Sequence, residues 1–268
     1  MTRRAASIAV AIAATLLAAR DARAVDPFEI QVYDGTADAP GTAGLEAHLN
    51  HVANGVRDAE YPELAPHRQS HLTFEPSFGV TRFWELGAYL QTAVRGDGSY
   101  DYAGVKLRSK FVTPPEKSLR LGLNLELSNI PETYDRHLWG GEIRPILAWE
   151  TKYTLLAANP IVSRSDTWSF EPAVKAMLMA PGFVGGGLEY YGSTDGEHYL
   201  YEVVDLLSEE DLELEAGVGE GLTGQSNPLV FKVIVGIAFD VASKKGAKSS
   251  ARPCLSPWRA TARASTTR

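Results

Sequence analysis

Leucine occupies every second position of the stretch Leu119-Arg120-Leu121-Gly122-Leu123-Asn124-Leu125-Glu126-Leu127-Ser128. The positions between the leucines hold glycine or polar and charged residues. Because successive side chains of a β-strand point to opposite faces, this period of two predicts a strand with one apolar and one polar face. No convincing amphipathic helix appears in the chain, so we expect an all-β protein.

The same alternation recurs along most of the chain and divides it into strand-like segments. Most of them approach the roughly 9–11 residues with which a tilted strand crosses a bilayer. Short turns alternate with mostly longer loops, as in outer-membrane barrels, whose periplasmic turns are short. We therefore predict an antiparallel transmembrane β-barrel of about 12 strands, with both of its ends in the periplasm. The predicted strands are 43–54, 69–80, 82–93, 101–113, 118–130, 140–150, 153–163, 167–179, 183–192, 198–206, 211–222 and 229–240.

A further strand-like segment at 28–34 falls outside this even count. We interpret residues 25–42 as a periplasmic or lumen-contacting N-terminal segment, and residues 43–240 as the barrel. In the alternative interpretation, 28–34 is the first barrel strand and one of the later segments is not a strand.

The apolar face of each strand must lie either inside a soluble β-protein or against lipid. Aromatic residues stand near the predicted strand ends, as the interfacial girdles of a membrane barrel require. The last strand ends at Phe239, an aromatic terminus typical of bacterial outer-membrane barrels. We therefore expect a barrel in the bacterial outer membrane, in contact with its lipid and inserted by the barrel assembly machinery. A secreted soluble β-sandwich or lipocalin-like barrel is the alternative.

Both ends of the chain differ in composition from the barrel segment. Residues 1–24 combine an arginine pair, an uncharged apolar run and Ala22-Arg23-Ala24, a pattern typical of a cleaved signal peptide for Sec export. Residues 241–268 are basic, lack periodicity and are predicted to be a disordered tail. The formal net charge is −7 although both ends are basic, so the body is strongly acidic, which argues against nucleic acid as a partner.

Three short Gly-containing motifs show a resemblance to a known family: 74–81 (FEPSFGVT), 85–87 (ELG) and 217–223 (GVGEGLT). With these motifs, the layout of residues 45–240 resembles proteobacterial outer-membrane barrels of the MetA-pathway-of-phenol-degradation and hydrocarbon-transporter type. The resemblance implies passage or uptake of small solutes, apolar or aromatic ones among them. It implies no catalytic residues. Such barrels end at the terminal aromatic residue, whereas this chain continues beyond it.

Charged residues on the second face of the strands are the main candidates for a functional site. We expect a basic lumen wall and, about half a barrel away, an acidic wall, which would together set a field across a pore. Salt bridges that plug the narrow lumen are the alternative. The basic candidates are Lys106, Arg108, Lys110, Arg120 and Arg144, and the acidic ones are Glu202, Glu213 and Glu215.

Four tyrosines flank the 192–198 loop and are candidates for contact with a ligand, although an interfacial girdle is the simpler explanation. His48 and His71 lie on facing predicted strands near Glu46 and Glu75, and these donor types suit zinc or copper. Because no H-x-x-H or H-E-x-x-H motif is present, ordinary hydrogen bonding in the lumen is the favoured explanation, and we expect no cofactor and no metal. Ser77, His71 and Glu75 lie on one predicted strand and do not predict a catalytic triad, so a barrel hydrolase is the less favoured alternative to a channel or a closed structural barrel. No sequence feature predicts an oligomeric state. The four tyrosines are Tyr190, Tyr191, Tyr199 and Tyr201.

Overall fold

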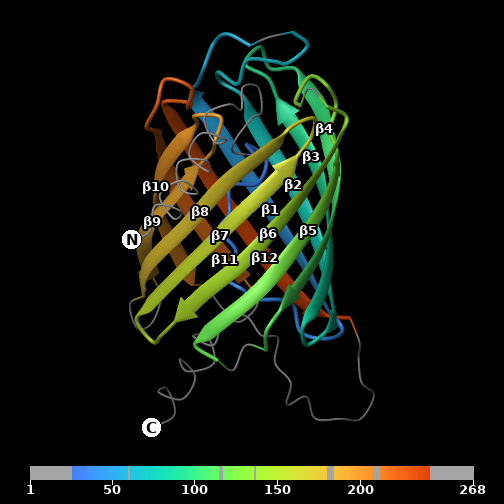
Figure 1. The fold of residues 1–268 in the computed structure, drawn as a ribbon, viewed down its shortest axis with the longest axis vertical. Coiled ribbons are helices and arrows are strands. Elements are labelled where there is room, and N and C mark those ends of the chain that lie inside the picture. The colour runs from blue at the N-terminus through green and yellow to red at the C-terminus, as the bar shows by residue number, and fades with distance from the viewer. Residues whose placement is uncertain are drawn as a thin grey trace, which may run out of the picture.

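The computed structural model describes residues 26–59, 61–114, 117–135, 137–179, 184–207 and 212–241. They form a closed antiparallel β-barrel of 12 strands, in which each strand pairs with its neighbours in sequence and β1 pairs with β12 (Figure 1). The strands are β1 (Thr42–Asn54), β2 (Ser70–Thr81), β3 (Trp84–Val94), β4 (Tyr100–Val112), β5 (Leu119–Asn129), β6 (Trp139–Glu150), β7 (Thr154–Arg164), β8 (Trp168–Met179), β9 (Val184–Gly192), β10 (His198–Leu207), β11 (Leu212–Gly221) and β12 (Leu229–Asp240).

The predicted fold class and strand order are confirmed. Every strand begins and ends within two residues of its predicted bounds. The predicted signal peptide, the short turn predicted at 180–183, residues 208–210 of the short turn predicted at 207–210 and all but the first residue of the predicted tail lie outside the described residues. No helix in the described part of the chain is both long and apolar enough to cross a membrane.

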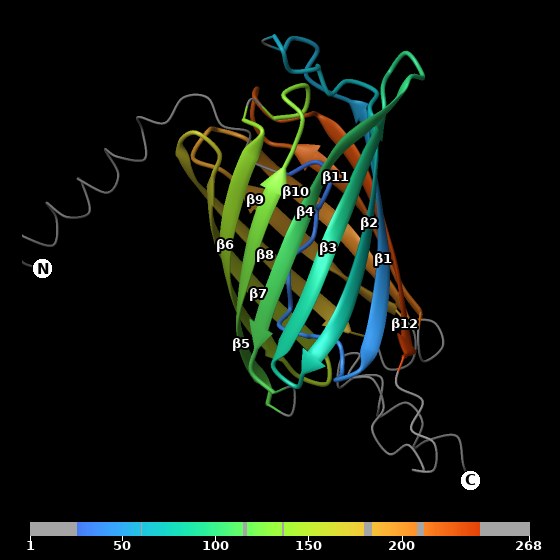
Figure 2. The same ribbon diagram turned by 90° about the vertical axis from the view of Figure 1, so that its right-hand side faces the viewer.

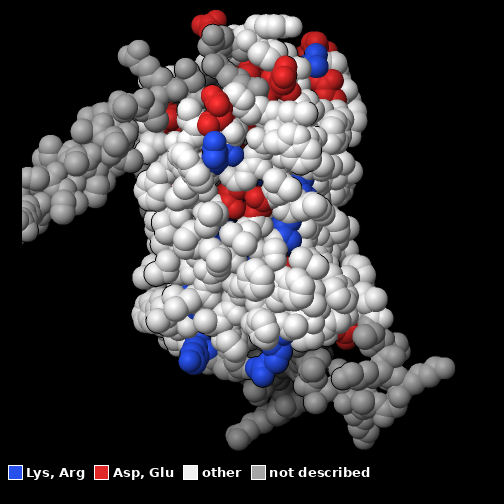
Figure 3. Space-filling model, turned by 45° about the vertical axis from the view of Figure 1, so that its right-hand side comes forward, with Lys and Arg blue, Asp and Glu red and all other residues white. Residues whose placement is uncertain are grey.

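The apolar face of the strands points outward. On β5, Leu119 and Leu127 are about half exposed, whereas Arg120 and Asn124 between the leucines are completely buried inside the barrel. Figure 3 shows the consequence: most of the outer wall is uncharged and charged side chains gather at its two ends, with one further group of acidic and basic side chains visible at mid-height. A soluble barrel would have the opposite arrangement, so the outer face has the character of a lipid-facing wall.

Aromatic side chains mark both edges of this apolar wall. Trp139 and Trp168 lie at the end of the barrel that carries the longer loops, while Trp149 and Tyr153 lie at the end with the short turns. Each of these four side chains is between 45% and 59% exposed. Two girdles of exposed amphipathic rings are the arrangement expected where a barrel meets the two membrane–water interfaces.

Residues 26–41, which we call the N-terminal strap, lie inside the barrel. Figure 2 shows this segment in blue within the lumen, reaching the short-turn end where β1 begins. Residues 28–34 form no strand, so the first barrel strand is the one that starts at Thr42. At the short-turn end the strap passes so close to Gly79 that a Cβ there would meet the carbonyl oxygens of Asp38 and Ala39 well below 3.0 Å. Glycine at position 79 therefore leaves room for the strap.

Candidate functional site: the charged lumen and its strap

Wall side chains hold the strap by its backbone. The Asn159 side chain accepts a hydrogen bond from the Tyr33 amide nitrogen (2.7 Å) and donates one to the Tyr33 carbonyl (3.0 Å). Across the lumen, Lys232 Nζ donates to the Ile30 carbonyl at 3.1 Å. These contacts satisfy backbone groups that have no strand partner inside the barrel. The strap is therefore fixed to opposite walls.

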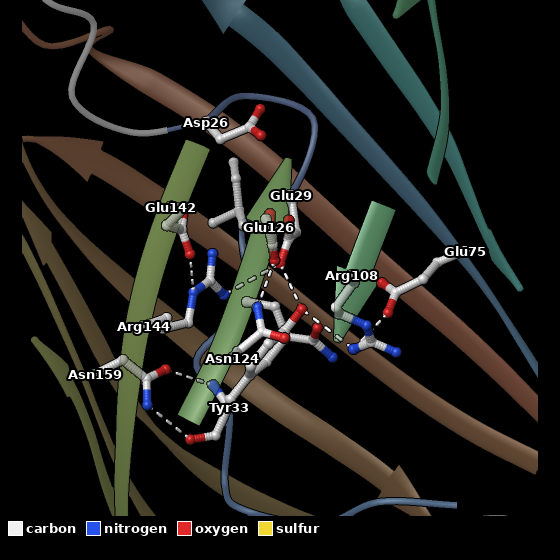
Figure 4. Close-up of polar contacts among 12 residues, drawn as sticks. Asp26, Glu29, Tyr33, Glu75, Arg108, Asn124, Glu126, Glu142, Arg144 and Asn159 are labelled. Carbon is white, nitrogen blue, oxygen red and sulfur yellow. Dashed lines mark hydrogen bonds and ion pairs between the residues drawn. The ribbon is translucent and has the colours of Figure 1, made fainter. Parts of the chain in front are cut away.

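The strap is acidic and lies against the predicted basic wall. It carries Asp26, Glu29, Asp34 and Asp38, and no lysine or arginine. Glu29, which is 3% exposed, pairs with Arg144 Nη1 at 3.1 Å (Figure 4) and with Lys106 Nζ at 3.3 Å. Asp26 also pairs with Lys106, and Asp34 Oδ2 lies 3.3 Å from Arg120 Nη2. The strap thus supplies counter-ions to cations that would be costly to bury alone.

Glutamates of the wall itself complete the neutralisation of the basic wall. Arg108 pairs through its two terminal nitrogens with Glu75 Oε1 and Glu85 Oε1, each at 2.7 Å. Lys110 Nζ lies 2.9 Å from the same oxygen of Glu85. Arg120 and Arg144 have wall partners too, at 2.6 Å in each case: Glu150 for Arg120 and Glu142 for Arg144.

The Tyr33 ring of the strap lies among these cations. The Arg144 guanidinium is 4.4 Å from the ring centroid and the Lys110 ammonium 5.3 Å, both within the range of cation–π attraction. The Tyr33 hydroxyl lies 2.5 Å from the hydroxyl of Tyr89 and donates to Glu29 at 2.8 Å. One aromatic residue therefore joins the strap to three strands.

The predicted acidic wall contains its own cations. Glu215 pairs with both Lys175 and Lys232, and Glu189 lies 3.2 Å from Lys175 Nζ and 2.5 Å from Lys232 Nζ. These four side chains are almost completely buried. The cations of both walls are thus paired with carboxylates, which for the basic wall come partly from the strap, so the lumen is not divided into a purely basic and a purely acidic side.

The assignment of Glu202 to the lumen is wrong. Its neighbours Tyr201 and Val203 are buried on the inner face, whereas Glu202 is exposed on the outer face beside Leu188 and Val218. Strand parity forces this choice, because Tyr201 and Glu202 cannot both face inward. The larger aromatic ring fills the lumen, and it packs where Gly219 leaves space.

Strand parity also places the four candidate tyrosines on either the inner or the outer face of the barrel. Tyr191, Tyr199 and Tyr201 are buried on the inner face, and the rings of Tyr191 and Tyr201 meet edge to face with centroids 5.5 Å apart. Tyr190 lies on the outer face, with its hydroxyl 2.8 Å from His198 Nδ1. Glu213 is exposed, but it lies at the short-turn end of β11, beside a water-accessible cavity.

This cavity forms a vestibule at the short-turn end of the lumen. Its volume is about 130 Å³, and it lies between the strap and the inner faces of β1–β4, β7, β8 and β10–β12. Carboxylates outnumber cations in its lining. The charged lining residues are Asp34, Asp38, Glu46, Glu85, Asp205, Glu213, Glu215, Arg108, Lys110 and Lys175.

The other end of the lumen is covered by an apolar cap. Phe28 of the strap is 2% exposed and packs with Ile130, Tyr134 and Leu64 from the long-loop end. Burial and a 2.9 Å hydrogen bond to Asp101 raise the pKa of Tyr134 to about 12, so its hydroxyl remains a donor at neutral pH. Solutes therefore meet a cap at one end of the lumen and a polar vestibule at the other.

The hydrolase candidates of β2 do not assemble into a triad. Ser77 Oγ donates to Asp38 Oδ2 of the strap at 2.5 Å, and His71 Nε2 lies 3.0 Å from Gln69 Oε1. A different serine–histidine contact occurs on the outer face, where Ser70 Oγ lies 2.8 Å from His51 Nδ1. Within the described residues no carboxylate orients the His51 ring, as a hydrolytic triad would require.

Asn159, Gly79 and the acidic strap residues were not predicted from the sequence. One signal was available: residues 26–41 contain four carboxylates and no cation, immediately before a barrel with a basic inner stripe. Opposite charge on a segment that is too short for another barrel hairpin would have predicted the strap's position.

Comparison with known proteins supports the fold. No protein-family model and no curated protein sequence matches the chain. Among solved structures, it is similar to the COG4313 outer membrane channel from Pseudomonas putida F1, with a TM-score of 0.53 and 11% identity over 79% of this chain and 100% of that one. The KdgM porin in complex with disordered oligogalacturonate has a TM-score of 0.48 and 12% identity over 74% and 99%. Outer membrane phospholipase A from Escherichia coli has a TM-score of 0.43 and 13% identity, over 85% of this chain and 97% of that one. The likeness to the COG4313 channel agrees with the fold of an outer-membrane β-barrel.

Proposed function

We propose that this protein is an outer-membrane channel for small solutes, which pass beside the N-terminal strap. The observation that carries the proposal is the vestibule, in which carboxylates outnumber cations at the mouth of an otherwise ion-paired lumen. Charged rings of this kind select ions in pores. Small polar or cationic solutes fit this lining better than the apolar or aromatic solutes implied by the family resemblance.

Single-channel recording from the purified protein in a planar bilayer tests the proposal. We expect a small, steady conductance because the strap narrows the lumen, and a reversal potential in a KCl gradient that favours cations. A heat-modifiable, folded barrel that carries no current would contradict it. That outcome would favour a closed-lumen structural or interaction barrel, in which the cap around Phe28 stays shut.

A lipid hydrolase is the second alternative, and the Ser70–His51 contact on the outer face is the observation that gives it a test. Fatty-acid release from phospholipid vesicles should be absent in the wild-type protein if the channel assignment is correct. Release that disappears in Ser70→Ala would instead establish an enzyme and replace the channel proposal.

A further inference from the structure

A histidine and two glutamates meet on the inner faces of β1 and β2. Glu46 and Glu75 are direct cross-strand partners, and His48 lies two residues further along β1. His48 Nε2 is 3.2 Å from Glu75 Oε2 and 3.4 Å from Glu46 Oε2. We infer that Glu46, His48 and Glu75 form a binding site for a divalent transition-metal ion such as Zn²⁺.

The spacing of the ligand atoms supports this inference. A tetrahedral ion with bonds of about 2.0–2.1 Å to nitrogen and oxygen holds its ligand atoms roughly 3.3 Å apart. Both His48–carboxylate distances match that edge, and one ligand atom from each residue lies within 4.8 Å of the others. An ion at the centre of the three would need little movement of the walls.

The chemistry of the donors fits the same class of ion. Imidazole combined with carboxylates suits zinc and copper. Arg108 Nη1 holds Glu75 through Oε1 at 2.7 Å, which leaves Oε2 turned toward His48. This is the role of an outer-shell partner that orients a metal-binding carboxylate.

An ion can reach the site from the vestibule. The side chain of Glu46 is 34% exposed and lines that cavity, whereas His48 and Glu75 are buried behind it. From the strap, Gln31 Nε2 donates to Glu46 Oε2 at 3.1 Å. A metal bound to Glu46 would therefore also fix the side chain that Gln31 holds, and so link the strap to the barrel wall.

The chain supplies a matched control in His71. This residue is also buried on the inner face, on the neighbouring β2, but its Nε2 faces Gln69 and its ring packs on Phe28. Replacement of His71 removes a lumen imidazole without touching the three proposed ligands.

The experiment is a zinc titration of the full, tag-free protein purified from membranes, in competition with a chromophoric chelator. We expect one zinc per chain. His48→Gln and Glu75→Gln should weaken binding by more than about 100-fold, beyond what loss of an outer-shell partner causes. His71→Gln should bind as the wild type does. Cobalt bound to the wild type should show the intense visible absorption of a tetrahedral site.

Two results would overturn the inference: no zinc bound by the folded wild type at about 100 µM, or equal affinity in His48→Gln and His71→Gln. If the variants of the buried residues fail to fold, Glu46→Gln replaces a ligand that is partly exposed, and we expect it to weaken zinc binding to the same extent. Because zinc binding is measured directly, the outcome is independent of whether the barrel conducts ions.

Discussion

The side chain of Asn159 on β7 hydrogen-bonds both backbone groups of Tyr33, accepting from its nitrogen at 2.7 Å and donating to its carbonyl at 3.0 Å. Asn159 is completely buried, so water does not compete for these two bonds. A single amide thus takes the place of a neighbouring strand for one residue of the strap. Removal of this contact would test directly whether the strap limits passage through the lumen.

Asn159→Leu should loosen the strap. Leucine has a similar volume but leaves two buried backbone groups without partners, each at a cost of roughly 1–3 kcal/mol. We expect the free energy of unfolding in urea to fall by about 2–6 kcal/mol, and single-channel conductance to rise in current recordings.

The control for this variant is Gln91→Leu. Gln91 is another fully buried amide of the inner wall, but neither polar atom of its side chain has a hydrogen-bond partner in the described structure. We expect its replacement to leave stability and conductance unchanged or slightly raise stability. An equal loss in both variants would show that lumen packing, and not the hold on Tyr33, is responsible.

Gly79→Val should displace the strap at the short-turn end. The new side chain would overlap the backbone carbonyls of Asp38 and Ala39, which cannot turn away as a flexible side chain could. We expect lower thermal stability of the heat-modifiable band on gels and faster proteolysis within residues 26–41. Gly186→Ala, where an added Cβ meets nothing within 4 Å, should behave as the wild type does.

Glu213→Lys should weaken the preference for cations. Glu213 is exposed and lines the vestibule, so the substitution changes the sign of a charge at the entrance without burying it. The cation-to-anion permeability ratio, measured from reversal potentials in a KCl gradient, should fall by roughly twofold or more. Glu220→Lys reverses an exposed charge at the far end of the same strand and should leave the ratio unchanged.

Leu125→Lys should destabilise the barrel in lipid according to depth. Leu125 lies on the outer face near the middle of β5, where a lysine costs about 2–4 kcal/mol. Leu119→Lys, on the same face at the edge of the wall, should cost only about 0–1 kcal/mol. Equal costs in urea unfolding from lipid vesicles would contradict a membrane-spanning outer face.

The fold could be predicted from sequence because each strand carries its own two-residue period, as Leu119 to Leu127 on β5 shows. The alternation does not show which side of a strand faces the lumen where both sides carry large residues. On β10, either Tyr201 or Glu202 could have pointed inward, and the Tyr201 ring does so because it fits into the space beside Gly219. The strap's contacts could not be predicted, because the partnership of Tyr33 with Asn159 joins residues 126 positions apart and leaves no local pattern.

The strap also touches both strands of the closing seam. Asn50 of β1 donates to the Pro27 carbonyl at 3.0 Å, and Lys232 of β12 donates to the Ile30 carbonyl at 3.1 Å. These two strands are the first and last of the barrel and meet only when the cylinder closes. The segment that leads into β1 therefore hydrogen-bonds to both strands of this pair from inside the barrel. Pairing of β1 with β12 and enclosure of the strap are therefore steps of the same assembly event.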